Sequence, residues 1–130
     1  MNEIYDFLNS CETYFLGTVE NNMPRVRPFG TVLLFEHKIY IQTGKSKNVY
    51  KQLLENPNAE LCAFKDGKWI RINGKLIPDD RVNVKKAMLD KYPSLRSMYD
   101  ENDDNTIVLY FKDATATIYS FTEEPKKLFI

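Results

Sequence analysis

The sequence predicts one domain of the α+β class, mainly β, in which an antiparallel barrel carries flanking helices. The chain has 130 residues, which suits a single domain of common size. About seven β-like runs follow one another mostly through short turns, and three or four helical segments are interspersed. Strands joined by short turns pair antiparallel, whereas a parallel sheet needs a long crossover for each pair. We therefore expect residues 1–130 to form one barrel domain, with the helices as lids or plugs.

The β-like runs are rich in β-branched and aromatic residues. They cover residues 14–19, 24–35, 38–43, 60–64, 69–77, 106–111 and 115–121. Asp66 and Gly67 have the chemistry of a tight hairpin turn, and His37 lies in another expected turn. Gly74 indicates a bulge or a sharp bend. Residues 112–114 are expected to join the last two strands.

Three segments have the apolar spacing of helices. They are residues 2–10, a stretch from near Ser46 to Asn56, and a stretch that Pro78 opens and that ends before Pro93. Asn2 and Ser46 are the candidate N-caps of the first two, and a proline stops the second and the third. An acidic loop, residues 100–104, follows the third helix.

Composition and charge exclude several classes of protein. The 18 Lys plus Arg balance the 18 Asp plus Glu, which argues against general nucleic-acid binding and against a polybasic membrane binder. Apolar runs such as Val32–Phe35 are far too short to span a bilayer. The N-terminus lacks the pattern of a secretory signal, so we expect a cytoplasmic protein.

The sequence offers no candidate residues for a metal site or for hydrolytic catalysis. The single histidine, His37, stands beside no nucleophile. Cys11 and Cys62 lack the spacing of a zinc site or a redox pair, and we interpret them as small, reduced core residues.

The segment from Thr43 to Lys47 has the chemistry of a phosphate site. A strand ends, a glycine follows and a helix begins near Ser46, so free backbone N–H groups and the positive end of the helix dipole should converge there. Lys45, Lys47 and Lys51 add positive charge with no acid in between, and the hydroxyls of Thr43 and Ser46 add donors. A solvated, lysine-rich first turn is the alternative, but lysines there are unfavourable for the helix itself. The pattern therefore favours an anion site.

The tripeptide Gly44-Lys45-Ser46 does not make this segment a nucleotide-triphosphate loop. That loop requires a further glycine at position 39, where Ile39 stands. No parallel βαβ pattern surrounds the tripeptide either, so an ATP or GTP site is excluded.

A second candidate region runs from Pro24 to Gly30. Arg25 and Arg27 are two residues apart, so they project from the same side of a strand. Pro24 and Pro28 remove two backbone N–H donors, which indicates an edge strand. Such an edge can hydrogen-bond the rim of a flat heterocycle while arginine offsets negative charge on it. A solvated edge protected by Arg and Pro explains the same residues equally well.

Aromatic residues are plentiful, with eight Phe, eight Tyr and one Trp. Many must belong to the core or to a subunit interface. Trp69 follows the tight turn at the start of a strand, where it can pack on a ligand ring, although a lone Trp is more often structural.

The order of these features resembles the pyridoxamine 5′-phosphate oxidase-like, FMN-binding split-barrel superfamily. The segments that carry the resemblance are Pro24–Pro28, Ile39–Gly44, Ser46-Lys47, Trp69–Gly74 and Ala116–Phe121. They cover nearly the whole chain in order. The short proteins related to nitroimidazole-resistance flavoproteins and to general-stress flavin-binding proteins are the most similar group.

The resemblance implies a homodimer of split barrels with two FMN molecules at the subunit interface. The cofactor-binding residues that it implies are Arg25, Arg27, Pro28, Phe29, Gly30, Gln42, Thr43, Ser46, Lys47 and Trp69. Thr43, Ser46 and Lys47 would hold the phosphate. The segment from Arg25 to Gly30 would lie along the isoalloxazine, and Trp69 would approach from the second subunit.

Two departures limit what the resemblance implies about chemistry. Gln42 stands where the nitroimidazole-resistance group is expected to have His, which argues against that group's particular reaction. The tail from Glu123 to Ile130 lacks the Arg- and Trp-containing signature of true pyridoxamine phosphate oxidases, which argues against vitamin B6 oxidation.

We therefore expect an FMN-dependent oxidoreductase that passes electrons from a reduced nicotinamide to a small acceptor such as a nitroaromatic, a quinone or oxygen. The cofactor carries the redox chemistry and the protein supplies position and charge. Lys47 would neutralise the phosphate, and Arg27 or backbone N–H groups near Phe29 and Gly30 would stabilise the reduced flavin. No residue is assigned as a general acid or base.

Two other functions stay open at this point. The barrel could hold FMN, or another phosphorylated heterocycle, for storage, sensing or stress protection without turnover. It could also bind nucleic acid through Arg25, Arg27, Lys45, Lys47 and exposed aromatic rings. The neutral net charge and the acidic loop count against the second of these.

Overall fold

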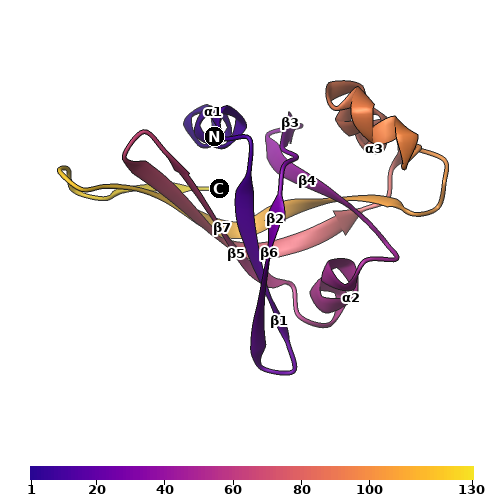
Figure 1. Ribbon diagram of the computed structural model, residues 1–130, viewed down its shortest axis with the longest axis horizontal. Coiled ribbons are helices and arrows are strands. Elements are labelled where there is room, and N and C mark those ends of the chain that lie inside the picture. The colour runs from indigo at the N-terminus through magenta and orange to yellow at the C-terminus, as the bar shows by residue number, and fades with distance from the viewer.

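A curled antiparallel sheet of eight strands forms the body of the protein (Figure 1), and the computed structural model describes all 130 residues. The elements are α1 (Asn2–Ser10), β1 (Tyr14–Glu20), β2 (Met23–Phe29), β3 (Leu33–Phe35), β4 (Lys38–Gly44), α2 (Asn48–Glu55), β5 (Asn58–Lys65), β6 (Lys68–Asp79), α3 (Val82–Lys91), the 3-10 helix η1 (Pro93–Ser97), β7 (Thr106–Ser120) and β8 (Lys126–Phe129). The strand order is β2-β1-β5-β6-β7-β4-β3, with β8 on β7. The sheet does not close, because β2 and β3 are its two ends. This confirms the predicted α+β split barrel.

Three tight turns connect the hairpins β1–β2, β3–β4 and β5–β6. Both central residues have positive φ in each turn: Asn21 and Asn22, Glu36 and His37, Asp66 and Gly67. Turns of this kind match the right-handed twist of paired strands. The turns predicted at His37 and at Asp66-Gly67 are therefore confirmed, as is the edge position of β2.

The last strand differs from the prediction. Residues 106–120 form one continuous strand, β7, where the sequence predicted two strands joined at 112–114. The ladder with β6 shifts register between Asn73 and Lys75, which confirms an irregularity at Gly74. A Cβ atom on Gly74 would lie 2.5 Å from the Cβ of Ala114, so only glycine lets β7 pass the bend unbroken.

The positions at which the helices begin also differ from the sequence prediction. The N-caps are Met1 for α1 and Lys47 for α2, and neither has a side-chain cap, so the capping roles predicted for Asn2 and Ser46 are wrong. Pro78 does not open a helix, because β6 continues to Asp79 and α3 begins at Val82.

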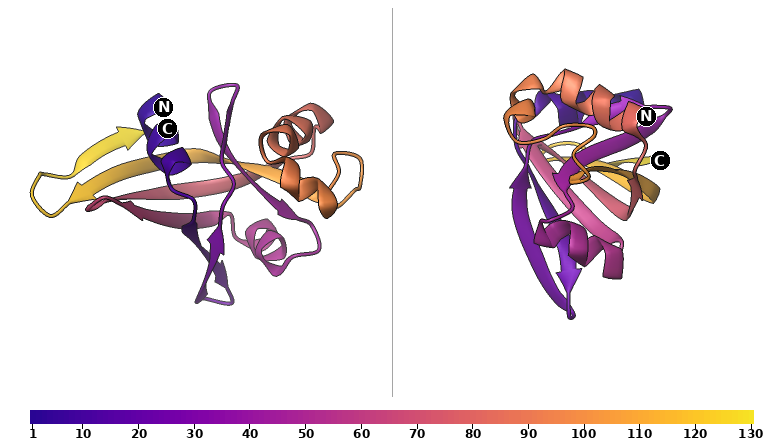
Figure 2. Two further views of the ribbon diagram at one scale, coloured as in Figure 1. Left: turned by 45° about the horizontal axis from the view of Figure 1, so that its top comes forward. Right: turned by 90° about the vertical axis from the view of Figure 1, so that its right-hand side faces the viewer.

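The core lies inside the curl of the sheet and a second cluster lies outside it. The main core takes residues from β1, β4, β5, β6 and β7, and the buried sides of α1 and α2 contribute to it. Helix α2 packs against β1 and β4, so it bridges the two sides of the split. Helix α3 packs with Tyr40 and Val108 on the other face of β4 and β7. Figure 2 shows α1 and α3 on one side of the molecule and α2 on the opposite side.

None of the helices has the length and apolar character needed to cross a membrane.

Candidate anion site between β2 and α2

A cavity of about 390 Å³ lies between the β1–β2 hairpin and the first turns of α2. Its lining residues are Glu20, Arg25, Val26, Arg27, Lys47, Asn48, Val49 and Gln52. Three cations face one carboxylate there, which leaves a local charge of +2. A phosphate monoester carries nearly two negative charges at neutral pH. The cavity therefore has the charge that a phosphate monoester requires.

Arg27 is the central cation of this cavity, and only neutral groups hold it. Its Nη1 donates to the carbonyl of Leu16 at 3.1 Å and to Oγ1 of Thr18 at 2.8 Å, and its Nη2 donates to Oε1 of Gln52 at 2.7 Å. The Thr18 hydroxyl in turn donates to the same Gln52 oxygen at 2.6 Å. Burial lowers the pKa of Arg27, and the more distant carboxylate of Glu20 only partly opposes this. The guanidinium is thus fixed in direction but not neutralised.

Arg25 differs from Arg27 because it has an acidic partner. Its Nε lies 3.0 Å from Oε1 of Glu20, and both side chains are about half exposed to solvent. Such a pair contributes little to stability. Arg25 can therefore exchange its partner for an anion in the cavity at little cost.

Lys47 lies at the start of α2, where the cavity meets the helix. The first N–H groups of a helix have no acceptor within it, and α2 has no side-chain cap. Asn48 and Val49, its first two residues, line the cavity. Lys47 makes no ion pair, so its charge and the positive end of the helix act in the same place.

The loop before α2 does not offer the free backbone N–H groups that the sequence predicted. Lys45 N–H donates to the carbonyl of Asn105 at 2.7 Å, and Ser46 N–H donates to Oδ1 of Asn105 at 3.0 Å. Lys47 N–H donates to the carbonyl of Gly44 at 3.0 Å. The expectation that these groups face an anion is wrong for all three, and the helix start itself remains as the backbone donor.

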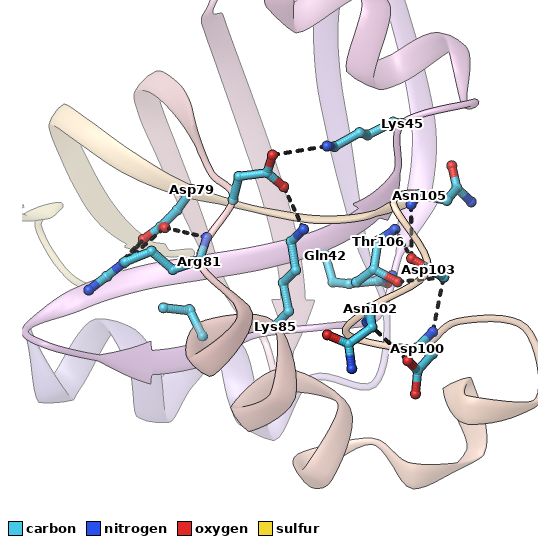
Figure 3. A network of polar contacts seen from close by, with 12 residues as sticks. Gln42, Lys45, Asp79, Arg81, Lys85, Asp100, Asn102, Asp103, Asn105 and Thr106 are labelled. Carbon is cyan, nitrogen blue, oxygen red and sulfur yellow. Dashed lines mark hydrogen bonds and ion pairs between the residues drawn. The ribbon is translucent and has the colours of Figure 1, made fainter.

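The predicted cluster of three free lysines is also reduced. Lys45 Nζ lies 3.0 Å from Oδ2 of Asp80, and Asp80 also binds the buried Lys85 (Figure 3). These hydrogen bonds lower the pKa of Asp80, with Lys85 as the larger cause. The charge of Lys45 is therefore compensated outside the cavity.

Neighbouring residues on β4 alternate between its two faces, as a strand requires. Gln42 lies on the α3 side, near Lys85 (Figure 3), and its Nε2 donates to the carbonyl of Thr43 at 3.1 Å. Thr43 is buried on the opposite face, which β4 shares with the main core. Neither residue lines the cavity, and neither does Ser46, which is exposed.

Pro28 and Phe29 end β2 beyond Arg27, away from the β1–β2 turn, and Gly30 follows the strand. Phe29 packs on Tyr14 with ring centroids 6.0 Å apart. Pro28 pairs with Phe15 on the outer face, so this stretch forms the rim of the barrel.

Trp69 lies far from the cavity within the same chain. It follows the β5–β6 turn, and its ring stacks on Tyr119 at 5.4 Å and lies 5.2 Å from Phe121. Strand β6 is separated from β2 by β1 and β5, which corresponds to about 14 Å across the sheet. Trp69 also points to the outer face, whereas Arg27 points inward across from Leu16.

Two residues of the cavity network were missed from the sequence. Thr18 and Gln52 are buried polar side chains that hold Arg27. Both stand in apolar patterns: Thr18 continues the inward alternation of Tyr14 and Leu16, and Gln52 lies beside Leu53 on the buried side of α2. A polar residue at an apolar position is the signal that could have found them.

A larger cavity, of about 650 Å³, lies between α1 and the β7–β8 hairpin. Four carboxylates and two lysines line it, and one of these lysines, Lys126, is tied to Glu3 at 2.8 Å. Its excess of acid does not suit an anion. No group of three or more His, Cys, Asp or Glu side chains in the protein is arranged to hold a metal ion.

Comparisons of the sequence and of the fold with known proteins point to one family. The family model described as pyridoxamine 5′-phosphate oxidase matches residues 1–92. A NimC/NimA family protein from Clostridium acetobutylicum is 38% identical, with a TM-score of 0.96 over 100% of this chain and 92% of that one. No curated protein matches the chain.

More distant structures share the fold alone. General Stress Protein 26 from Bacillus anthracis is 20% identical, with a TM-score of 0.75 over 97% of either chain. A heme binding protein from Mycobacterium smegmatis is 12% identical, with a TM-score of 0.70 over 92% of this chain and 53% of that one.

Proposed function

Because the chain belongs to the pyridoxamine 5′-phosphate oxidase family, we propose that it binds FMN with the phosphate in the cavity between β2 and α2, and that it is an oxidoreductase. One observation carries this proposal. Arg27 is fixed toward the cavity by Thr18 and Gln52 yet lacks an acidic partner. A partly buried cation of this kind is expected to gain an anionic ligand, because burial of an uncompensated charge is costly.

The residues around the cavity would divide the binding between them. Arg27 and Lys47 would hold the phosphate directly, and Arg25 would join them by releasing Glu20. The start of α2 would add backbone donors. The rest of the ligand would follow β2 toward Gly30, along an edge whose outward N–H and C=O groups no neighbouring strand uses.

Bound FMN would supply the redox chemistry, taking a hydride from a reduced nicotinamide and passing two electrons to a small acceptor. The contribution of the protein would be to orient the ring and to place positive charge beside it. We assign no residue as a general acid.

We further propose that the protein is a homodimer that pairs through the outer face of the sheet. That face exposes large apolar side chains: Phe15 is 53% exposed, Val26 68%, Phe64 61% and Phe121 79%. Strand pairing brings Phe15 near Phe64, since Phe15 lies opposite Cys62 on β5, two residues from Phe64. Large apolar side chains exposed on one face are typical of an interface.

The dimer would also explain the position of Trp69. Within one chain this ring is three strands away from β2 and on the other face. A second copy on the outer face would bring its Trp69 toward the β2 rim of the first. The proposed site would then be complete only in the dimer.

Visible absorption of the purified protein, mixed with FMN and passed through a desalting column, tests the binding. We expect a retained flavin band and, with NADH or NADPH, turnover with at least one of nitrofurazone, menadione and oxygen. A retained band without turnover would favour the storage or sensing function. A colourless protein would refute FMN binding and the oxidoreductase together, and light scattering that shows a monomer at micromolar concentration would refute the dimer.

A further inference from the structure

The acidic loop between η1 and β7 holds the β4–α2 loop in place. Asn105, which directly follows the acidic residues 100–104, accepts both N–H groups at the turn of the β4–α2 loop. Lys45 N–H donates to its carbonyl at 2.7 Å and Ser46 N–H donates to its Oδ1 at 3.0 Å. The turn is closed by Lys47 N–H on the carbonyl of Gly44 at 3.0 Å. One asparagine therefore satisfies the two backbone donors that the turn leaves open.

The two loops are in close contact at this point. A Cβ atom on Gly44 would lie 3.0 Å from Nδ2 of Asn105 and 3.1 Å from the Tyr99 ring. These distances are tighter than most Cβ contacts, so a larger residue at position 44 would require the side chains of Asn105 and Tyr99 to shift by a few tenths of an ångström.

Asn105 is itself fixed by Asp103 (Figure 3). Oδ1 of Asp103 accepts the N–H of Asn105 at 2.8 Å and that of Thr106 at 2.7 Å, and its Oδ2 accepts the Thr106 hydroxyl at 3.0 Å and Asp100 N–H at 2.9 Å. Desolvation opposes the charge of Asp103, but these backbone N–H groups prevail and lower its pKa to about 2. The acidic loop is thus a stiff support built around one carboxylate.

We infer that Asn105 is a positioning residue for phosphate recognition. Its two hydrogen bonds set the turn from which Lys47 and the start of α2 enter the cavity, while Asn105 itself lies behind the turn and does not line the cavity. The inference rests on the proposed FMN site and deepens it. It assigns the acidic loop to the selection of phosphorylated over unphosphorylated flavin.

Comparing FMN with riboflavin tests this role, because the two differ only in the phosphate. In Asn105→Ala we expect the Kd for FMN to rise roughly 2- to 12-fold, the range for loss of one hydrogen bond. The Kd for riboflavin should change less than the Kd for FMN does. Asn102→Ala is the matched control, since it removes an exposed asparagine from the same loop whose side chain makes no hydrogen bond. It should leave both constants unchanged.

The outcomes separate this inference from the proposed function. If wild-type protein prefers FMN and Asn105→Ala keeps the same FMN-to-riboflavin ratio, the positioning role is refuted and the FMN site stands. Equal weakening of both flavins also refutes it, because it indicates general loosening of the fold. If wild-type protein binds neither flavin, the proposed function fails and the inference with it. If the alanine variant does not fold, the Kd for FMN and for riboflavin is measured on Asn105→Ser, which keeps a polar but shorter side chain. The same outcomes then support or refute the positioning role.

Discussion

Replacing Arg27 by Met removes the cation on which the proposed phosphate site depends while keeping an unbranched side chain. A hydrogen bond to a charged group contributes about 1.5–3 kcal/mol. Loss of one such bond to the phosphate should raise the Kd for FMN roughly 10- to 150-fold. Riboflavin, which lacks the phosphate, should lose far less.

The stability of the ligand-free protein should change less than the affinity does. Met loses three hydrogen bonds to neutral partners, each of about 0.5–1.5 kcal/mol. It also removes a cation whose pKa is lowered by burial, which means that the fold disfavours the charged form. The two effects oppose each other, so the unfolding temperature without ligand should move only modestly in either direction.

Fluorescence titration with FMN measures the affinity, and thermal unfolding with and without FMN measures the linked stabilisation. At saturating ligand the stabilisation should fall by about 1.4 kcal/mol for each tenfold loss of affinity. Arg81→Met is the control, because Arg81 pairs with Asp79 and Glu36 and does not line the cavity. The reasoning is refuted if Arg27→Met binds FMN as tightly as Arg81→Met does.

Three further predictions follow from the described contacts. Lys47→Ala should weaken FMN by about 1–3 kcal/mol and leave riboflavin unchanged in titration, whereas Lys51→Ala, outside the cavity lining, should change neither. Phe64→Glu places a charge on the outer face and should give a monomer by light scattering, whereas Met98→Glu, at a site 71% exposed outside that face, should not. The pKa of Asp103 is lowered from 3.8 to about 2, so its ionisation stabilises the fold above about pH 4 and this contribution is lost as the pH falls toward 2. The difference in unfolding temperature between wild type and Asp103→Asn should therefore shrink over that pH range, and a constant difference would contradict the assignment.

Local chemistry explains which parts of the fold the sequence predicted. The Asp66-Gly67 turn and the two prolines of β2 act through their own backbone dihedrals and missing donors, so they are visible without the rest of the chain. The break predicted at 112–114 is wrong for the opposite reason. Asp113 does adopt positive φ, as a turn residue would, but Gly74 on the facing strand provides the room that keeps β7 continuous. That contact joins residues far apart in sequence.

The residues of the proposed site also divide into those that the sequence predicted and those that it did not. Arg25, Arg27 and Lys47 were predicted from residue type and spacing, and the fold brings all three to one cavity. The hydrogen-bond partners could not be predicted, because they come from other elements. Asn105 is 59 residues from Ser46, and Gln52 is 25 residues from Arg27.

The partner of each cation, more than the number of cations, determines where an anion can bind. Lys45 and Lys47 are two residues apart and equivalent by sequence, yet Asp80, 35 residues away, compensates Lys45 and leaves Lys47 free. Arg27 is held by an amide oxygen and a hydroxyl, which orient a guanidinium without cancelling its charge. A carboxylate at the position of Gln52 would orient Arg27 equally well, but it would fill the role of the phosphate. A neutral polar residue at that buried position is therefore what an anion site requires, and Gln52→Glu should abolish FMN binding while it preserves the fold.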